Sequence, residues 1–103
     1  MKSNKAQIIN ERLTSLDVFS ERNSVRECRD VAIGEYLIYF CAEERRFVYS
    51  VVVGMPANPV KKVTLVCRQL HRSSVGTLRL DKFTVYKIDS KILSQISLVE
   101  LPE

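Results

Sequence analysis

The chain has 103 residues, of which 46% are hydrophobic and 27% are charged, with a formal net charge of +4. This composition predicts a single folded domain over residues 1–103 and excludes a disordered tail, while the charge is too small to identify a partner. The longest uncharged apolar runs, Tyr36–Ala42 and Val48–Ala57, are shorter than the roughly 20 residues that a membrane-spanning helix needs, so we expect no membrane partner.

A helix is predicted over residues 4–16, because apolar side chains recur there at the spacing of one helix face. These side chains are Ile9, Leu13 and Leu16. Asn4 and Gln7 have the spacing of a capping box at its start. Polar residues dominate 17–23, which predicts a connection. The segment Val25–Val31 fits either a helical turn or a strand, and both alternatives stay open.

Two long strands are predicted next. The dense run of β-branched and aromatic residues in Tyr36–Cys41 is typical of a strand covered on both faces. Ala42–Glu44 is predicted to be a hairpin connection. Apolar side chains alternate over Phe47–Met55, which predicts a strand with one strongly apolar face. We expect Phe40, Phe47 and Phe83 in the core, because a chain without Trp needs these rings there.

Three shorter strands are predicted over Lys62–Arg68, Thr77–Asp81 and Phe83–Ile88. The first is preceded by the turn-forming segment Pro56–Pro59, and the first two are separated by a loop at His71–Gly76. A final helix is then expected, since apolar side chains again share one face. The residues concerned are the cap candidates Asp89 and Ser90 and the apolar residues Ile92, Ile96 and Val99.

The order of these elements predicts a mainly β, α+β fold with a helix at each end. About five antiparallel strands at short spacing would form either a small OB-like barrel or a curled sheet with helices packed on it. The chain resembles oligonucleotide-binding barrels in its strand order and in the charge of its central section. That resemblance implies a surface for nucleic acid.

Basic residues dominate the middle of the chain. The window Arg45–Leu80 contains seven Lys and Arg residues and no Asp or Glu, whereas all twelve acidic residues lie outside it. If the cations converge on folding, they create a positive field that attracts a polyanion. The simpler interpretation is a solvated β surface kept soluble by charge.

Combined with tyrosines on the same predicted strands, this window suggests binding of single-stranded DNA or RNA without catalysis. Cations would follow the phosphates, and exposed tyrosine rings would stack on bases. The candidate nucleic-acid-binding residues are Arg45, Arg46, Tyr49, Lys61, Lys62, Arg68, Arg72, Arg79 and Tyr86. An acidic protein would meet the same charge, and composition does not separate the two partners.

A protein-interaction or accessory module is the alternative, either a homodimer or an inhibitor of a partner protein. It is suggested by the strand Phe47–Met55, whose second face is not very polar. That face carries Val48, Ser50 and Val52. If it is exposed, a Val-rich surface implies a partner that covers it.

Catalytic and metal sites are not expected. The three cysteines, Cys28, Cys41 and Cys67, form no C-x-x-C pair, so neither a zinc knuckle nor a disulfide scaffold is predicted. His71 is the only histidine, and the acid-free window offers no carboxylate to orient it beside Cys67. No glycine-rich phosphate loop is present. We therefore expect a non-enzymatic, intracellular protein without a cofactor, since the N-terminal sequence has no apolar signal segment.

Overall fold

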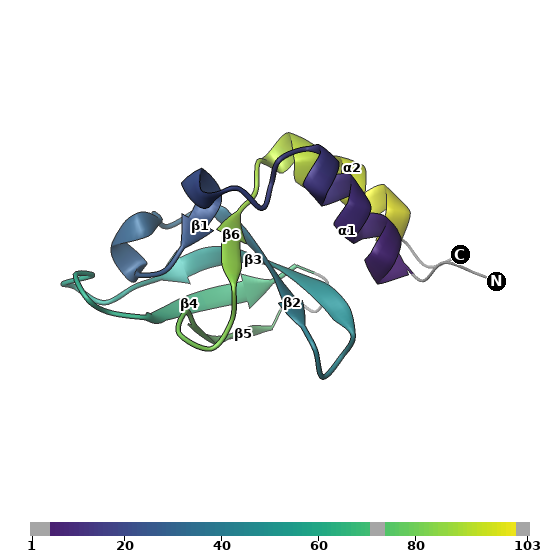
Figure 1. Cartoon of the computed structure of the whole chain (residues 1–103). Helices are drawn as coiled ribbons and strands as arrows, with labels where there is room; N and C mark the ends of the chain where they lie inside the picture. The colour runs from purple at the N-terminus through teal and green to yellow at the C-terminus, as the bar shows by residue number, and fades with distance from the viewer. Residues whose placement is uncertain (1–4, 71–73, 101–103) are drawn as a thin grey trace.

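The computed structural model describes residues 5–70 and 74–100, which form two α-helices and six strands (Figure 1). The helices are α1 (Lys5–Ser15) and α2 (Ser90–Glu100). The strands are β1 (Ser24–Val25), β2 (Tyr36–Cys41), β3 (Arg46–Gly54), β4 (Thr64–Gln69), β5 (Val75–Arg79) and β6 (Val85–Lys87). Two short 3-10 helices, Glu21–Asn23 and Cys28–Asp30, flank β1.

All six strands belong to one antiparallel sheet in the order β1-β6-β2-β3-β4-β5. Strands β2 to β5 follow one another as a meander, and β6 then returns to the free side of β2. The connection Leu80–Thr84 has only five residues and bends, with the Lys82 N–H donating to the Arg79 carbonyl at 3.2 Å. In a flat sheet, β5 and β6 would lie about 19 Å apart. The sheet therefore curls, but it is not closed into a barrel.

The curled sheet has a core on each of its faces, because side chains alternate along the strands. Buried residues from all six strands meet on the inner face, among them Leu37, Val52 and Leu65. On the outer face, both helices pack against β2, β3 and β6, and Ile38 and Ile96 are fully buried there. Figure 1 shows α1 and α2 side by side on this outer face. The helices thus cover only part of the sheet.

The mainly β, α+β class with a helix at each end is confirmed, and four predicted elements need correction. A sixth strand, β1, arises from the ambiguous Val25–Val31 segment, whose remainder contains a 3-10 helix. Strand β5 begins at Val75, inside the predicted His71–Gly76 loop. Strand β6 is shorter than Phe83–Ile88. The hairpin turn extends to Arg45, which adopts a φ of 54°.

The second face of β3 is not an exposed apolar surface. Val48, Ser50 and Val52 are all buried, and both valines belong to the inner core. The curl of the sheet encloses this face, which the alternation of β3 alone does not reveal. The predicted interaction surface on Val48, Ser50 and Val52 is therefore wrong.

Candidate functional site

The predicted cations do not converge on one groove. Arg45 and Arg46 lie at the start of β3, while Lys61 and Lys62 lie in the connection after its end. Because β3 has nine residues and a strand rises about 3.4 Å per residue, the two pairs are separated by roughly 27 Å along the strand. The mid-chain basic window therefore becomes separate local clusters in the fold.

Two further cations share the outer face of the β4–β5 hairpin. Arg68 lies opposite Val75 and Arg79 lies opposite Thr64, four residues apart along the ladder. Both oxygens of Asp81 accept hydrogen bonds from Arg79, at 3.0 Å from Nε and 2.7 Å from a terminal nitrogen. This contact raises the pKa of Arg79 and lowers that of Asp81. Arg79 is therefore largely neutralised within the chain, and the predicted site residue Arg72 lies outside the described residues.

The predicted stacking tyrosines occupy the outer core. Tyr49 is only 5% exposed and packs among the residues beneath the helices. This burial corrects the prediction that its ring is available for a base. Tyr86 is half-buried, with its ring centroid 5.1 Å from that of Phe19 in a tilted arrangement. Of the two tyrosines predicted to stack on bases, Tyr86 is therefore the one that borders an open space.

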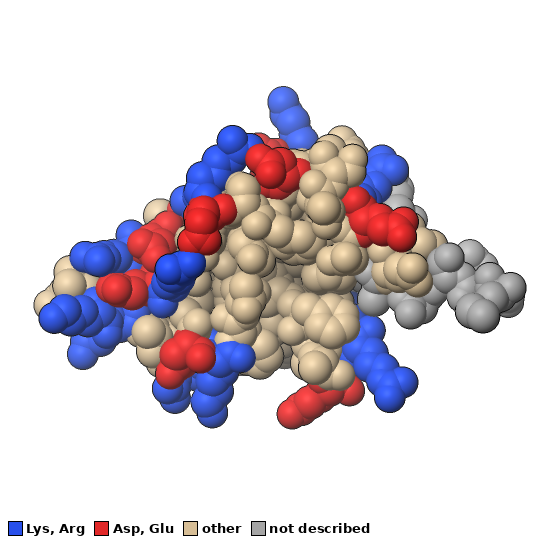
Figure 2. All heavy atoms as spheres, viewed as in Figure 1, with Lys and Arg blue, Asp and Glu red and all other residues tan. Residues whose placement is uncertain are grey.

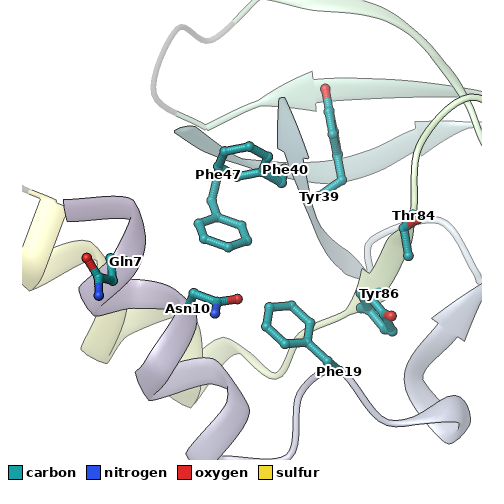
Figure 3. Close-up of a pocket in the computed structure, with 8 residues that line it drawn as sticks. All are labelled: Gln7, Asn10, Phe19, Tyr39, Phe40, Phe47, Thr84 and Tyr86. Carbon is teal, nitrogen blue, oxygen red and sulfur yellow. The ribbon is translucent and has the colours of Figure 1, made fainter. Parts of the chain in front are cut away.

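That space is an aromatic pocket of about 520 Å³ between α1 and the outer face of β2, β3 and β6 (Figure 3). We define the aromatic pocket by its lining residues. They are Gln7, Asn10, Phe19, Tyr39, Phe40, Phe47, Thr84 and Tyr86. Its volume lies in the range of about 300–1,000 Å³ that is typical of ligand sites. The pocket is therefore large enough to hold a bulky apolar group.

Four rings form the apolar wall of the pocket. Phe40 and Phe47 are cross-strand partners on β2 and β3, with ring centroids 5.2 Å apart in an edge-to-face arrangement. Phe19 stacks on Phe47 at 6.2 Å and also contacts Tyr86. Phe40 remains 44% exposed, so its ring is presented to solvent at the pocket. Such an exposed cluster of rings is typical of a binding site.

Phe19 reaches the pocket because of the way α1 ends. Asp17 adopts a φ of 61°, its N–H donates to the Thr14 carbonyl, and the Val18 N–H donates to the Leu13 carbonyl at 3.0 Å. These two bonds are those of a Schellman motif, which reverses the chain after a helix. Leu13 and Val18 are both buried beneath the turn. The reversal places Phe19 over the sheet beside Phe47 and Tyr86.

Polar groups lie at two places in the pocket lining. Figure 3 shows Asn10 extending from α1 toward the Phe19 ring, while Gln7 lies one turn earlier on the same helix. Thr84, just before β6, adds a hydroxyl. The Tyr39 side chain points away from the pocket, and its ring contacts Phe83 at 4.7 Å. An apolar group in the pocket would therefore meet rings on one side and hydrogen-bonding amides on the other.

Charges surround this apolar region without filling it. On the face seen in Figure 2, tan side chains occupy the centre, and Lys, Arg, Asp and Glu of both signs lie around the margin. Some of the charged side chains form exposed ion pairs, such as Arg22–Asp17 at 2.9 Å. The local field is therefore mixed in sign rather than strongly positive.

Cys28 and Cys67 are buried core residues, and Cys41 is half-buried. Burial, together with the nearby Cys28, raises the pKa of the Cys67 thiol to about 11. Cys67 is therefore protonated at neutral pH, and a thiol is a weak nucleophile. Its predicted neighbour His71 lies outside the described residues. Within residues 5–70 and 74–100, no three His, Cys, Asp or Glu side chains gather as metal ligands.

Sequence reasoning identified Tyr86 but missed the other parts of the pocket. Phe47 is buried as predicted, whereas Phe40 and Phe83 are exposed rather than in the core. Phe19 lies in the segment that was interpreted only as a polar connection. A Phe in such a segment, directly after the end of a helix, indicates a packing contact, because a large ring there needs a surface to pack on.

Comparisons with protein-family models, with curated proteins and with solved structures found no significant match for this chain. In the described part of the chain, neither helix has the length and apolar character required to cross a membrane.

Proposed function

We propose that this chain is a non-catalytic protein-interaction module that receives a bulky apolar side chain of a partner protein in the aromatic pocket. The observation that carries the proposal is the pocket itself, in which the exposed ring of Phe40 continues the surface of Phe19 and Phe47. Anchoring by one or two large apolar side chains in such a pocket is the usual source of affinity at protein interfaces.

The charge distribution supports a protein partner over nucleic acid. Protein interfaces combine an apolar centre with a polar rim, and the face in Figure 2 has this arrangement. Nucleic-acid interfaces are much more positively charged, since affinity depends on neutralising several phosphates. Arg45 and Arg46 lie the length of β3 away from Lys61 and Lys62, and this separation works against such neutralisation.

The polar residues at the pocket supply orientation. The side-chain amide of Asn10 can both donate and accept hydrogen bonds, and the hydroxyl of Thr84 can do the same. Both lie beside the rings in the pocket lining. A partner segment with its apolar side chain in the pocket would therefore hydrogen-bond its backbone groups to Asn10 on α1 or to Thr84 before β6.

Selection of peptides tests this proposal with a probe that needs no known partner. The full chain is used to select from a phage-displayed library of random peptides, and we expect the selected peptides to share an aromatic, Leu or Met anchor. Binding of a labelled selected peptide is then measured by fluorescence anisotropy with wild type, Phe40→Ser and Val53→Ser. Val53 is the matched control, since it is 41% exposed on β3 but does not line the pocket.

We expect Phe40→Ser to weaken peptide binding at least about tenfold, as for an anchor contact worth about 1.4 kcal/mol or more, and Val53→Ser to leave it unchanged. The proposal is wrong if selected peptides have no apolar anchor, or if both variants bind as wild type does.

Binding of single-stranded nucleic acid is a second candidate, and the position of one basic pair favours it. Arg45 and Arg46 lie on the hairpin whose strands carry Phe40 and Phe47, so a base in the aromatic pocket would have its phosphate near cations. The predicted resemblance to oligonucleotide-binding barrels would support this second candidate. Anisotropy with labelled single-stranded oligonucleotides tests it: affinity must fall steeply as salt rises, and the absence of binding at low salt excludes it.

A further inference from the structure

Strand β5 is a free edge of the sheet. It is the last strand in the sheet order and pairs only with β4. Its residues Val75, Gly76 and Thr77 are exposed, and Val75 has an exposed fraction of 63%. The opposite edge, β1, has only two residues. An edge strand presents unpaired backbone groups that another strand can pair with, so β5 is the more suitable of the two edges for such pairing.

The hydrogen bonds of β4 with the chain around β5 fix which residues face this edge. The Gln69 N–H donates to the Ser74 carbonyl at 3.0 Å, and the Leu80 N–H donates to the Val63 carbonyl at 2.7 Å. Backbone groups alternate in direction along an antiparallel strand. Ser74, Gly76, Leu78 and Leu80 therefore face β4. The remaining residues, Val75, Thr77 and Arg79, direct their N–H groups to the free edge, as do the carbonyls of Val75 and Thr77. The Arg79 carbonyl accepts the Lys82 N–H within the chain.

These outward-facing residues are self-complementary. We propose that two copies of this chain pair antiparallel through β5, with the two-fold axis at Thr77. In this register, Thr77 of one copy lies opposite Thr77 of the other, and Val75 of each lies opposite Arg79 of its partner. The opposed threonines exchange two backbone hydrogen bonds, and the N–H of each Arg79 donates to the Val75 carbonyl of the partner copy. The interface is isologous, as closed dimers require.

The side chains of β5 suit this register. Opposed threonines are a favourable cross-strand pair, and no like charges lie directly opposite each other. Arg79 is already bonded to Asp81 in its own chain, so its charge is compensated before the copies meet. The aliphatic stem of Arg79 would cover Val75 of the partner copy. Val75 is the most exposed of the large hydrophobic residues in the described chain. The cationic β4–β5 hairpin can therefore meet its own copy without needing an acidic partner.

This interface is separate from the aromatic pocket. The pocket is lined by residues of α1, β2, β3 and β6 together with Phe19 and Thr84, and none of its lining residues belongs to β5. Both pockets therefore stay open in the dimer, and one assembly would present two of them. Loss of the dimer and loss of peptide binding are distinguishable for this reason.

Sedimentation velocity over a range of protein concentrations tests the dimer. We expect the full chain to shift from its monomer mass of 11.8 kDa toward twice that mass as concentration rises. Thr77→Lys places two cations at the two-fold axis and is expected to weaken dimerisation at least about tenfold. The matched control is Thr14→Lys, since Thr14 is an exposed threonine on α1, away from the free edge of β5.

Amide hydrogen exchange on the wild type supplies a second measurement that needs no variant. The amides of Thr77 and Arg79 are expected to become more protected at high protein concentration, while other surface amides do not change. A wild type that stays monomeric at all concentrations overturns the proposal. So does a dimer that Thr77→Lys and Thr14→Lys affect equally, or one that leaves these two amides unprotected.

Discussion

The two faces of the sheet are built from similar residues but are covered to different extents. The inner face is enclosed by the curl of the sheet itself, and its central residues Leu37, Val52 and Leu65 are fully buried. The outer face depends on two 11-residue helices, which cover β2, β3 and β6 only in part. The pattern of a strand therefore determines which side chains share a face. The length and position of the helices determine which of these side chains remain open for binding.

The largest effect is expected when the inner face is disrupted. Leu37→Ala removes a side chain with 0% exposure and leaves a cavity among strands that cannot collapse around it. We expect a loss of about 2–5 kcal/mol in the free energy of unfolding, measured by urea denaturation. A loss below about 1 kcal/mol would contradict a closely packed inner core.

A smaller effect is expected at the turn that places Phe19 in the pocket. Asp17→Val puts a β-branched side chain at a φ of 61° and is expected to cost about 1–2 kcal/mol in the free energy of unfolding. Asp17→Gly is the matched control, because it also removes the Arg22 ion pair but tolerates this backbone conformation. Thermal or urea denaturation of both variants makes the comparison. Equal stability of the two would show that the turn is not strained by a side chain.

The inner face also predicts a dependence of stability on alkaline pH. Burial raises the pKa of Cys67 from its ordinary value of 9.0 to about 11, so the unfolded chain loses this proton at a lower pH than the folded chain does. The contribution of Cys67 to the free energy of unfolding is fully present below pH 9 and is lost as the pH rises through about 11. Urea denaturation at several pH values measures this, and Cys67→Val should remove most of the decline. If the stability of Cys67→Val falls with pH as much as that of the wild type, other groups cause the decline.

The smallest effect on stability is expected at the open part of the outer face. Phe40→Ser changes a ring that is 44% exposed, and we expect a loss of less than about 1 kcal/mol in the free energy of unfolding. The same variant is expected to lose peptide binding, so the two measurements separate function from packing. A destabilisation as large as that of Leu37→Ala would mean that Phe40 is a core residue and not part of a binding surface.

The sequence predicts most of the fold because its strongest signals are local. The apolar run of β2, the alternation of β3 and the spacing of Ile9 and Leu13 all correspond to real elements. Strand β1 could not be predicted in this way, because two residues carry no period and Val25 is paired with Val85, far along the chain. A curled sheet is one of the two predicted alternatives, and the short β5–β6 connection and the strand order account for it.

The candidate site was harder to predict because it depends on distances between elements. The acid-free window is continuous in sequence, yet β3 carries Arg46 and Lys61 to opposite ends of the sheet. Phe19 and Phe40 come from segments that predicted a connection and a covered strand. Both contact Phe47, and Phe19 does so because Asp17 reverses the chain after α1. Charge pattern alone therefore indicated the wrong surface.

The central claim is that the aromatic pocket binds an apolar side chain, and intermolecular NOEs test it most directly. A peptide selected on the full chain is added in saturating amount, and contacts between its apolar side chain and the protein are recorded by NMR. The account predicts NOEs from that side chain to the rings of Phe19, Phe40 and Phe47. NOEs confined to β4 and β5, with none to these rings, would contradict it.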